Sequence, residues 1–136
     1  MILRFVFPLL LASGMLLAGQ DSCGDLLAGL HKKPKQLEFV QCKPRPDRQG
    51  KPLEATYRVK GANAAEVERY LSVAFAMKRL TNACCVWESG ERDFQEKDGH
   101  TYYLSMSSGE TLITKRAEWK KIPYFYVEFC RETEEP

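Results

Sequence analysis

The sequence lacks the residue patterns that most metal sites and catalytic centres require. Its 136 residues include only two histidines, and no C-x-x-C, H-x-x-x-H or H-E-x-x-H spacing occurs. A G-x-S-x-G nucleophile motif and a glycine-rich phosphate loop are also missing. We therefore expect no cofactor, no metal ion and no catalytic residues, and we predict that the protein is not an enzyme.

The sequence also lacks a strong excess of charge of one sign. Lys and Arg number 20 and Asp and Glu number 18, a net charge of +2, whereas nucleic-acid-binding domains are normally strongly basic. We therefore expect no nucleic-acid partner. The charges nevertheless segregate, because residues 31–51 are mainly basic and residues 88–98 mainly acidic. Both stretches can be solvated turns, or one of them is a docking surface for an oppositely charged partner.

Long apolar runs are absent except at the N-terminus. Arg4 precedes an uncharged apolar run over residues 5–17, and Ala18 and Gly19 follow it. This pattern is typical of a secretory signal peptide, and the run is shorter than the about 20 residues that span a bilayer. We predict a cleaved signal peptide over residues 1–19 and one exported domain over residues 20–136, periplasmic or secreted, without a transmembrane segment.

A lipoprotein is the competing interpretation of the N-terminus. Cys23 would then be the site of lipid attachment, which requires small and apolar residues directly before the cysteine. Polar residues occupy positions 20–22 instead, so we favour an ordinary cysteine.

The odd number of cysteines leaves at least one without an intramolecular partner in an oxidising compartment. Cys84 and Cys85 are adjacent, and neighbouring side chains of a strand point to opposite faces. We therefore expect each to bridge a distant partner, with Cys23 and Cys42 as the candidates and Cys130 left over. The sequence does not fix which pairs with which.

Hydrophobic periodicity predicts an α+β domain. We expect an antiparallel sheet of about five strands, one long helix packed on a face of it and a short N-terminal helix. The long helix should begin after the N-cap Asn63, with Glu66 closing a capping box, and should run to Leu80. The other predicted elements are a helix over residues 23–30, strands over residues 36–42, 53–59, 84–88, 92–96, 101–107 and 124–130, an Asp98-Gly99 hairpin and a helical turn around Trp119.

Several short motifs together resemble an uncharacterised bacterial family of small exported proteins and lipoproteins, the domain of unknown function numbered 4952. Its most specific element is Cys84-Cys85-x-Trp87-Glu88. The others are Lys33-Pro34, Phe39, Cys42, Leu53-x-Ala55-x-Tyr57-x-Val59-x-Gly61, Val67-Glu68-x-Tyr70-Leu71, Met106, Glu110, Trp119 and Ile122. The resemblance implies a location in the bacterial cell envelope and no assigned activity. The sequence departs from the family in its weak lipid-attachment site and its additional Cys130.

A binding or inhibitory protein, such as an immunity protein against a toxin or an envelope hydrolase, is the function that we predict. The acidic stretch combines a possible aromatic anchor with a protruding hairpin, as interfaces require. The predicted docking residues are Trp87, Glu88, Glu91, Asp93, Glu96 and Asp98. Tryptophans such as Trp87 and Trp119 are, however, more often core residues than binding residues, and their burial would separate the two interpretations. The other candidate functions are an envelope protein of structural or stress-related role and a small hydrolase that uses Glu88 and Glu110.

Overall fold

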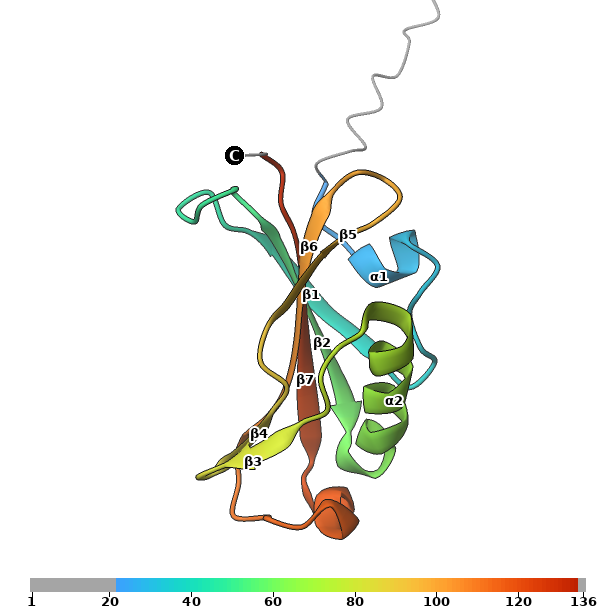
Figure 1. The fold of residues 1–136 in the computed structure, drawn as a ribbon, viewed down its shortest axis with the longest axis vertical. Coiled ribbons are helices and arrows are strands. Elements are labelled where there is room, and N and C mark those ends of the chain that lie inside the picture. The colour runs from blue at the N-terminus through green and yellow to red at the C-terminus, as the bar shows by residue number, and fades with distance from the viewer. Residues whose placement is uncertain (1–21, 135–136) are drawn as a thin grey trace, which may run out of the picture.

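The computed structural model describes residues 22–134, so the predicted signal peptide lies outside the described residues. One seven-stranded antiparallel sheet forms most of the domain, in the order β1-β2-β7-β6-β4-β3, and β5 also pairs with β6 (Figure 1). The strands are β1 (Glu38–Pro44), β2 (Leu53–Lys60), β3 (Thr81–Ala83), β4 (Val86–Glu88), β5 (Arg92–Gln95), β6 (Thr101–Glu110) and β7 (Tyr124–Arg131). The helices are α1 (Leu26–Gly29), η1 (Gly61–Asn63), α2 (Ala64–Phe75) and η2 (Arg116–Lys121).

The predicted fold of about five strands with one long helix is wrong. The sheet has seven strands, and the helices are short, with 12 residues in α2. The helix ends at Phe75 because Ala76 adopts a left-handed conformation with φ of 56°. Met77 and Leu80, which fit the helical period, are buried from a segment without regular secondary structure instead. Strand β3 then forms where the sequence indicated only the end of a helix.

Helix capping also differs from the prediction. The Asn63 side chain makes no capping hydrogen bond, so the predicted capping box does not form. At α1 the N-cap is Asp25, whose carboxylate accepts from the Ala28 amide at 3.0 Å. The Asp98-Gly99 hairpin between β5 and β6 and the helical turn around Trp119 are confirmed.

The sheet has two unlike faces because side chains alternate along each strand. Both α1 and α2 lie on one side of the sheet in Figure 1, and we call this side the covered face. Its side chains form the core with Leu27, Val67 and Leu71 of the helices. The sheet residues of this core are Leu53, Ala55, Tyr57, Val59, Trp87, Tyr102, Leu104, Met106, Phe125, Val127 and Phe129. The opposite side, which we call the open face, has no helix over it among the described residues.

A disulfide and a buried tyrosine attach α1 to the sheet. Cys23 is bonded to Cys42 of β1, with 5.3 Å between their Cα atoms. The Tyr57 hydroxyl donates to Asp25 at 2.8 Å and accepts from the Leu27 amide at 2.9 Å. The expectation that Cys23 and Cys42 would bridge Cys84 and Cys85 is therefore wrong, because strand β1 brings Cys42 to the start of α1.

Candidate functional site

Three rows of side chains cross the open face. Residues directly opposite each other in an antiparallel pair project from the same face, so the strand register assigns the rows. The first row is Glu38, Arg58, Tyr126, Ser107 and Glu88; the second is Gln41, Thr56, Glu128 and Ser105; the third is Lys43, Glu54, Cys130, Tyr103 and Asp93. This face is polar, in contrast to the apolar core on the other side of the same strands.

Arginines of the β1–β2 loop fold back onto the third row. Glu54 is only 7% exposed, and its carboxylate accepts from Arg45 at 3.2 Å and from Arg48 at 2.8 Å. The two guanidinium groups offset the cost of burying the negative charge of Glu54. The basic stretch of the sequence is therefore partly neutralised within the molecule at this loop.

Cys130 and Glu128 lie next to this cluster on β7. Burial raises the pKa of the Cys130 thiol to about 12, and the negative charges of Glu54 and Glu128 act in the same direction. Desolvation and the neighbouring Glu54 likewise raise the pKa of Glu128. The thiolate is the nucleophilic form of cysteine, so Cys130 stays a protonated, unreactive thiol at neutral pH.

Three tyrosines supply the aromatic surface of the open face. Tyr126 is 45% exposed, and the Arg58 guanidinium lies 4.5 Å from the ring centre of Tyr124. Tyr103 donates its hydroxyl to Glu132, and this hydrogen bond raises the pKa of Tyr103 to about 12. Arg58 also pairs with Glu38 at 2.8 Å. Neighbouring side chains therefore contact Tyr103 and Tyr124, and all three tyrosines present surface to solvent.

Trp87, the predicted aromatic anchor, belongs to the core. It is 6% exposed, its indole N–H donates to the Ile113 carbonyl at 2.8 Å, and its ring packs edge-on against Trp119 at 5.3 Å. Trp119 is also buried, at 3% exposure. These two side chains therefore stabilise the domain and are not free to contact a partner.

Two of the predicted docking carboxylates are bound within the molecule. Glu96 pairs with Lys32 at 2.9 Å, which joins the acidic stretch to the basic stretch. Asp98 accepts from the Tyr102 hydroxyl and from the His100 amide. Although partial burial opposes the change, these hydrogen bonds lower the pKa of Asp98. The hairpin tip is therefore held by its own side chains.

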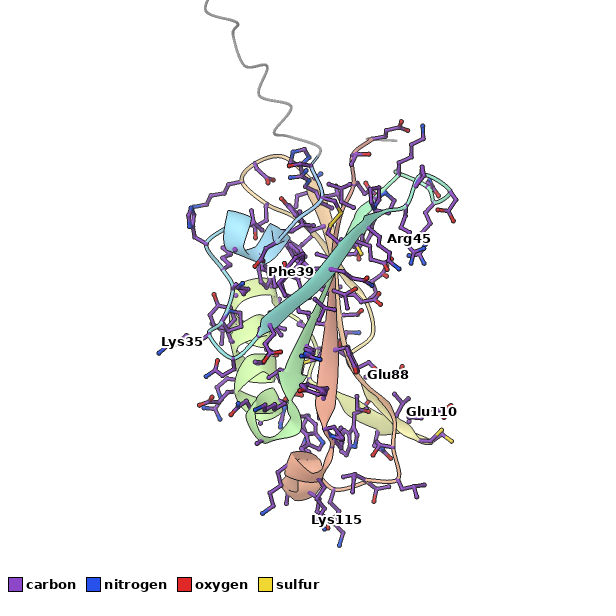
Figure 2. The ribbon with its side chains drawn as sticks, turned by 180° about the vertical axis from the view of Figure 1, so that it is seen from behind. Lys35, Phe39, Arg45, Glu88, Glu110 and Lys115 are labelled. Atoms are coloured by element: carbon purple, nitrogen blue, oxygen red, sulfur yellow. A yellow bond between two sulfur atoms is a disulfide. The ribbon has the colours of Figure 1, made fainter. Side chains whose placement is uncertain are left out.

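The remaining predicted docking carboxylates lie together at the β4–β5 side of the open face. Glu88, Glu91 and Asp93 are exposed, and no ion pair reaches them from any described residue. Figure 2 shows Glu88 and Glu110 projecting from the side of the sheet away from α2. Both are exposed, whereas a catalytic pair of carboxylates requires burial or a close like charge.

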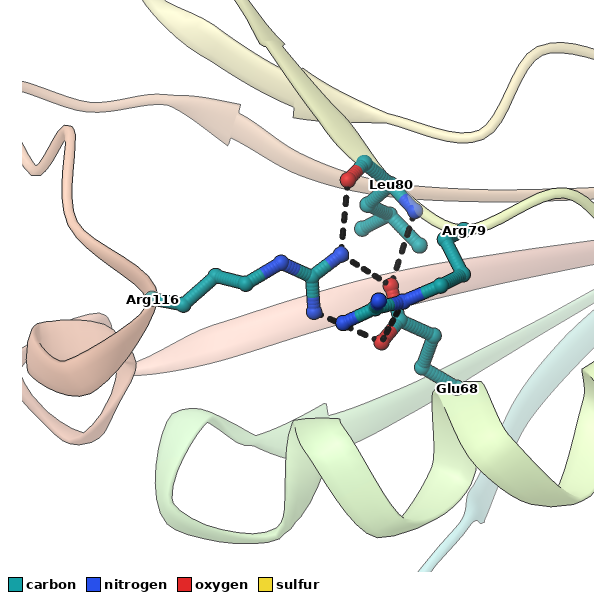
Figure 3. Close-up of polar contacts among 4 residues, drawn as sticks. All are labelled: Glu68, Arg79, Leu80 and Arg116. Atoms are coloured by element: carbon teal, nitrogen blue, oxygen red, sulfur yellow. Dashed lines mark hydrogen bonds and ion pairs between the residues drawn. The ribbon is translucent and has the colours of Figure 1, made fainter.

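Glu68 of α2 is buried, at 4% exposure, although it carries a charge. In Figure 3 the Glu68 carboxylate accepts hydrogen bonds from the two terminal guanidinium nitrogens of Arg116, each at 2.8 Å, and from the Leu80 amide at 2.8 Å. Arg116 also donates to the Leu80 carbonyl at 2.7 Å and lies 4.6 Å from the ring of Trp119. Because Arg116 is 48 residues away in the sequence, no local pattern could have indicated this pair.

Cys84 and Cys85 do not lie in a strand, contrary to the prediction for residues 84–88. They form the two-residue turn that connects β3 with β4, since Ala83 pairs directly with Val86. In a turn, neighbouring side chains can approach each other, and the two Sγ atoms lie 3.0 Å apart. The three cysteines outside the Cys23–Cys42 bridge are free thiols.

Within residues 22–134, no group of three or more His, Cys, Asp or Glu side chains could hold a metal ion. The helices of the same residues are too short or too polar for any of them to cross a membrane.

Comparisons with known proteins identify the family alone. No curated protein and no solved structure matches the chain. The family model described as a domain of unknown function (DUF4952) matches residues 16–87, slightly more than half of the 136 residues. The matched segment includes α1, β1, β2, α2 and the β3–β4 hairpin as far as Trp87, and the remaining strands complete the sheet beyond it. The predicted resemblance is confirmed, and the chain belongs to the DUF4952 family of domains of unknown function.

Proposed function

We propose that this chain is an exported binding protein whose open face docks on a basic surface of a protein partner and inhibits it, as an immunity protein inhibits a toxin. The partner would be a toxin or an envelope hydrolase, and the chain itself would not be an enzyme. The observation that supports this proposal is an uncovered sheet face that combines three tyrosines with carboxylates not engaged in ion pairs.

The composition of the open face suits protein recognition. Tyrosine supplies a large amphipathic contact area at a small cost in conformational entropy, and serine adds adaptable hydrogen bonds. Strands β6 and β7 contribute Tyr103, Tyr124 and Tyr126 together with Ser105 and Ser107. A paired sheet is also a rigid support, which reduces the entropy lost on binding.

The charge of the open face selects the chemistry of the partner. Glu54 and Glu38 are already paired with arginines, so the carboxylates left for a partner are Glu88, Glu91, Asp93 and Glu128. Lys43 adds one cation, without an ion pair to any described residue, at the β1 edge of the face, away from Glu88 and Asp93. Complementary charge steers association and excludes partners of like charge. A lysine-rich or arginine-rich patch on the partner is therefore the expected counterpart.

The chemistry of the titratable groups supports inhibition by binding. The one thiol on the open face, Cys130, has a pKa of about 12 and is not activated as a nucleophile. Glu88 and Glu110 are exposed. A tight protein–protein contact requires neither nucleophile nor general base, only anchors and complementary charge.

Affinity capture with matched charge variants tests this proposal. The wild-type chain would be immobilised and exposed to the envelope and secreted proteins of the producing bacterium. The double variant Glu88→Lys/Asp93→Lys reverses two open-face charges, and the control Glu66→Lys/Glu118→Lys reverses two charges outside the open face with the same change in net charge. We expect wild type and control to capture the same partner and the open-face variant to lose it.

The activity of the captured partner provides the second measurement. A stoichiometric amount of wild-type chain should suppress that activity, and the open-face variant should not. Equal capture by both double variants would contradict docking on the open face. Undiminished activity of the saturated partner would contradict an inhibitory role.

We also propose that residues 1–19 direct export and are removed. Cys23 supports cleavage without lipid attachment, because its sulfur is bonded to Cys42 and cannot also carry a thioether-linked lipid. When the full chain is expressed in a bacterium, we expect a periplasmic product that begins near Gln20, measured by fractionation and N-terminal sequencing. Uncleaved protein in the cytosol, or palmitate incorporation that depends on Cys23, would contradict this proposal.

A further inference from the structure

The tip of the β3–β4 hairpin presents two adjacent thiols to solvent. Cys84 and Cys85 are both exposed and are the only two residues between the paired Ala83 and Val86. Cys84 has a φ of 56°, a conformation for which two-residue hairpins normally use Gly, Asn or Asp. A side chain that occupies an unfavourable backbone conformation indicates a constraint other than turn stability.

The turn brings the two sulfurs close together. The Cys85 thiol donates to the Cys84 sulfur with 3.0 Å between the Sγ atoms. A disulfide bond is about 2.05 Å long, so the sulfurs need to approach by roughly 1 Å. Both side chains are exposed and lie beyond the last β3–β4 pair, Ala83 with Val86, so the ring can close outside the paired part of the hairpin.

We propose that Cys84 and Cys85 are a redox-active pair that closes reversibly into a vicinal disulfide by exchange with an external disulfide. The proposal is independent of the proposed docking function. It assigns a modification site to the hairpin, with a small-molecule or protein disulfide as the oxidant.

The exchange proceeds through a mixed disulfide. The Cys84 thiolate attacks one sulfur of the oxidant, and the first thiolate leaves and takes a proton from water. Cys85 then loses its proton to water and attacks the Cys84 sulfur, which forms the Cys84–Cys85 bond and releases the second thiolate, again protonated by water. The protein loses two protons and two electrons, and the oxidant gains them as two thiols.

Hydrogen bonding indicates which sulfur attacks first. The hydrogen bond to Cys84 raises the pKa of the Cys85 thiol, and desolvation and the charge of Glu110 act in the same direction. Cys85 therefore holds its proton while Cys84 accepts the hydrogen bond. We assign the first attack to Cys84 and the resolving attack to Cys85.

Geometry makes the closed form easy to reduce. Adjacent Cα atoms are about 3.8 Å apart, which is below the roughly 4.4 Å minimum usual for disulfides. The Cα atoms of Cys23 and Cys42 are 5.3 Å apart, within the usual range. Strained, exposed disulfides have the higher reduction potentials and are the labile ones, so the hairpin pair should open while Cys23–Cys42 stays closed.

Oxidised glutathione is the probe that tests the pair. The full chain, with Cys84 and Cys85 reduced, would be treated with oxidised glutathione and followed by intact mass and by release of glutathione thiol. We expect a loss of two hydrogens, about 2 Da, with two thiols released per chain and no retained adduct. On titration with reduced glutathione, the new bond should open at a concentration at least about tenfold lower than Cys23–Cys42 requires.

Serine variants separate ring closure from other thiol reactions. Cys85→Ser should retain one glutathione on Cys84, because the resolving thiol is missing. Cys84→Ser, which lacks the first attacking thiol, should react more slowly and retain one glutathione on Cys85. Cys130→Ser should behave like wild type, since the high pKa of that buried thiol removes it from the reaction. Circular dichroism would verify that the turn variants fold. A wild-type chain that retains glutathione adducts, or that forms disulfide-linked dimers instead of the ring, would overturn the proposal.

Discussion

Glu68 connects three separate segments through one carboxylate. Its oxygens accept from the Arg116 guanidinium and from the Leu80 amide, and Arg79 approaches to 4.0 Å. Although burial of the carboxyl opposes the change, these hydrogen bonds lower the pKa of Glu68. Helix α2, the segment that leads to β3 and the η2 turn are therefore held together at a single residue.

Replacing Glu68 should destabilise the fold markedly. Glu68→Ala leaves Arg116 and the Leu80 amide without their acceptor, and we expect a loss of about 2–3 kcal/mol in the free energy of unfolding. This is below the full value for a buried pair because the Arg116 side chain is 33% exposed. Urea denaturation measures the loss. Glu66→Ala, two residues earlier and exposed, is the control and should change stability by less than about 0.5 kcal/mol.

The same carboxylate should contribute to acid sensitivity. Because the folded protein lowers the pKa of Glu68 from the ordinary value of 4.5, its contribution is complete above that value and is lost as the pH falls through the folded pKa. The free energy of unfolding of Glu68→Gln should therefore depend less steeply on pH below about 4.5 than that of wild type. Parallel pH profiles for the two proteins would show that Glu68 titrates alike in the folded and unfolded states.

At the scale of elements, Gly61 sets the contact between η1 and η2. A Cβ atom at this position would lie 2.1 Å from the carbonyl oxygens of Trp119 and Ile122. These are backbone atoms of a neighbouring turn, which cannot move without displacing the buried Trp119. We expect Gly61→Ala to lower the free energy of unfolding by about 2–3 kcal/mol through overpacking.

Gly24 offers the matched control for Gly61. Nothing lies within 4 Å of a Cβ built at Gly24, so Gly24→Ala should leave stability within about 0.5 kcal/mol of wild type. Thermal or urea unfolding of the two alanine variants makes the comparison. Similar stability for both would mean that η1 and η2 separate without cost.

The Cys23–Cys42 disulfide, which bonds the segment before α1 to β1, should contribute substantially to the free energy of unfolding. It closes a loop with a sequence separation of 19, for which loop entropy predicts about 3 kcal/mol. The double variant Cys23→Ser/Cys42→Ser should lose about this amount in urea denaturation. Cys84→Ser/Cys85→Ser removes two exposed thiols instead and should be nearly neutral, and an equal loss in both variants would contradict the assignment.

Elements were predictable where local chemistry dictates them. The alternation of Tyr102, Leu104 and Met106 indicates β6, and Asp98-Gly99 indicates the hairpin before it. The β3–β4 hairpin was missed because its turn consists of two cysteines, one with positive φ, and not of the usual turn residues. The helix was predicted too long because Met77 and Leu80 are apolar at helical spacing, although tertiary packing buries them without a helix.

At the scale of the whole molecule, the open face could be predicted only in part. The acidic stretch indicated Glu88 and Asp93, which lie at one edge of the face. The tyrosines were missed as a group because Tyr103 and Tyr126 come from β6 and β7, which become neighbours only through the strand order of the sheet. For Trp87 the core interpretation is confirmed and the docking interpretation is wrong. The sequence could not decide between them because the partner of Trp87, Trp119, lies far along the chain.

Association of the open face with its partner should slow as the salt concentration rises. Long-range attraction between Glu88, Asp93 and a basic patch accelerates encounter, and at physiological ionic strength it is screened over about 8 Å. Biosensor kinetics with the captured partner should show an association rate constant that falls with added NaCl and a dissociation rate constant that changes less. Glu88→Lys/Asp93→Lys should associate slowly at every salt concentration, and its association rate constant should depend less steeply on salt.

Glu66→Lys/Glu118→Lys changes the net charge equally but lies outside the open face, so its association rate constant should keep the wild-type dependence on salt. Equal slopes for the two double variants would mean that net charge alone steers the encounter, and the open face would then not be the docking surface.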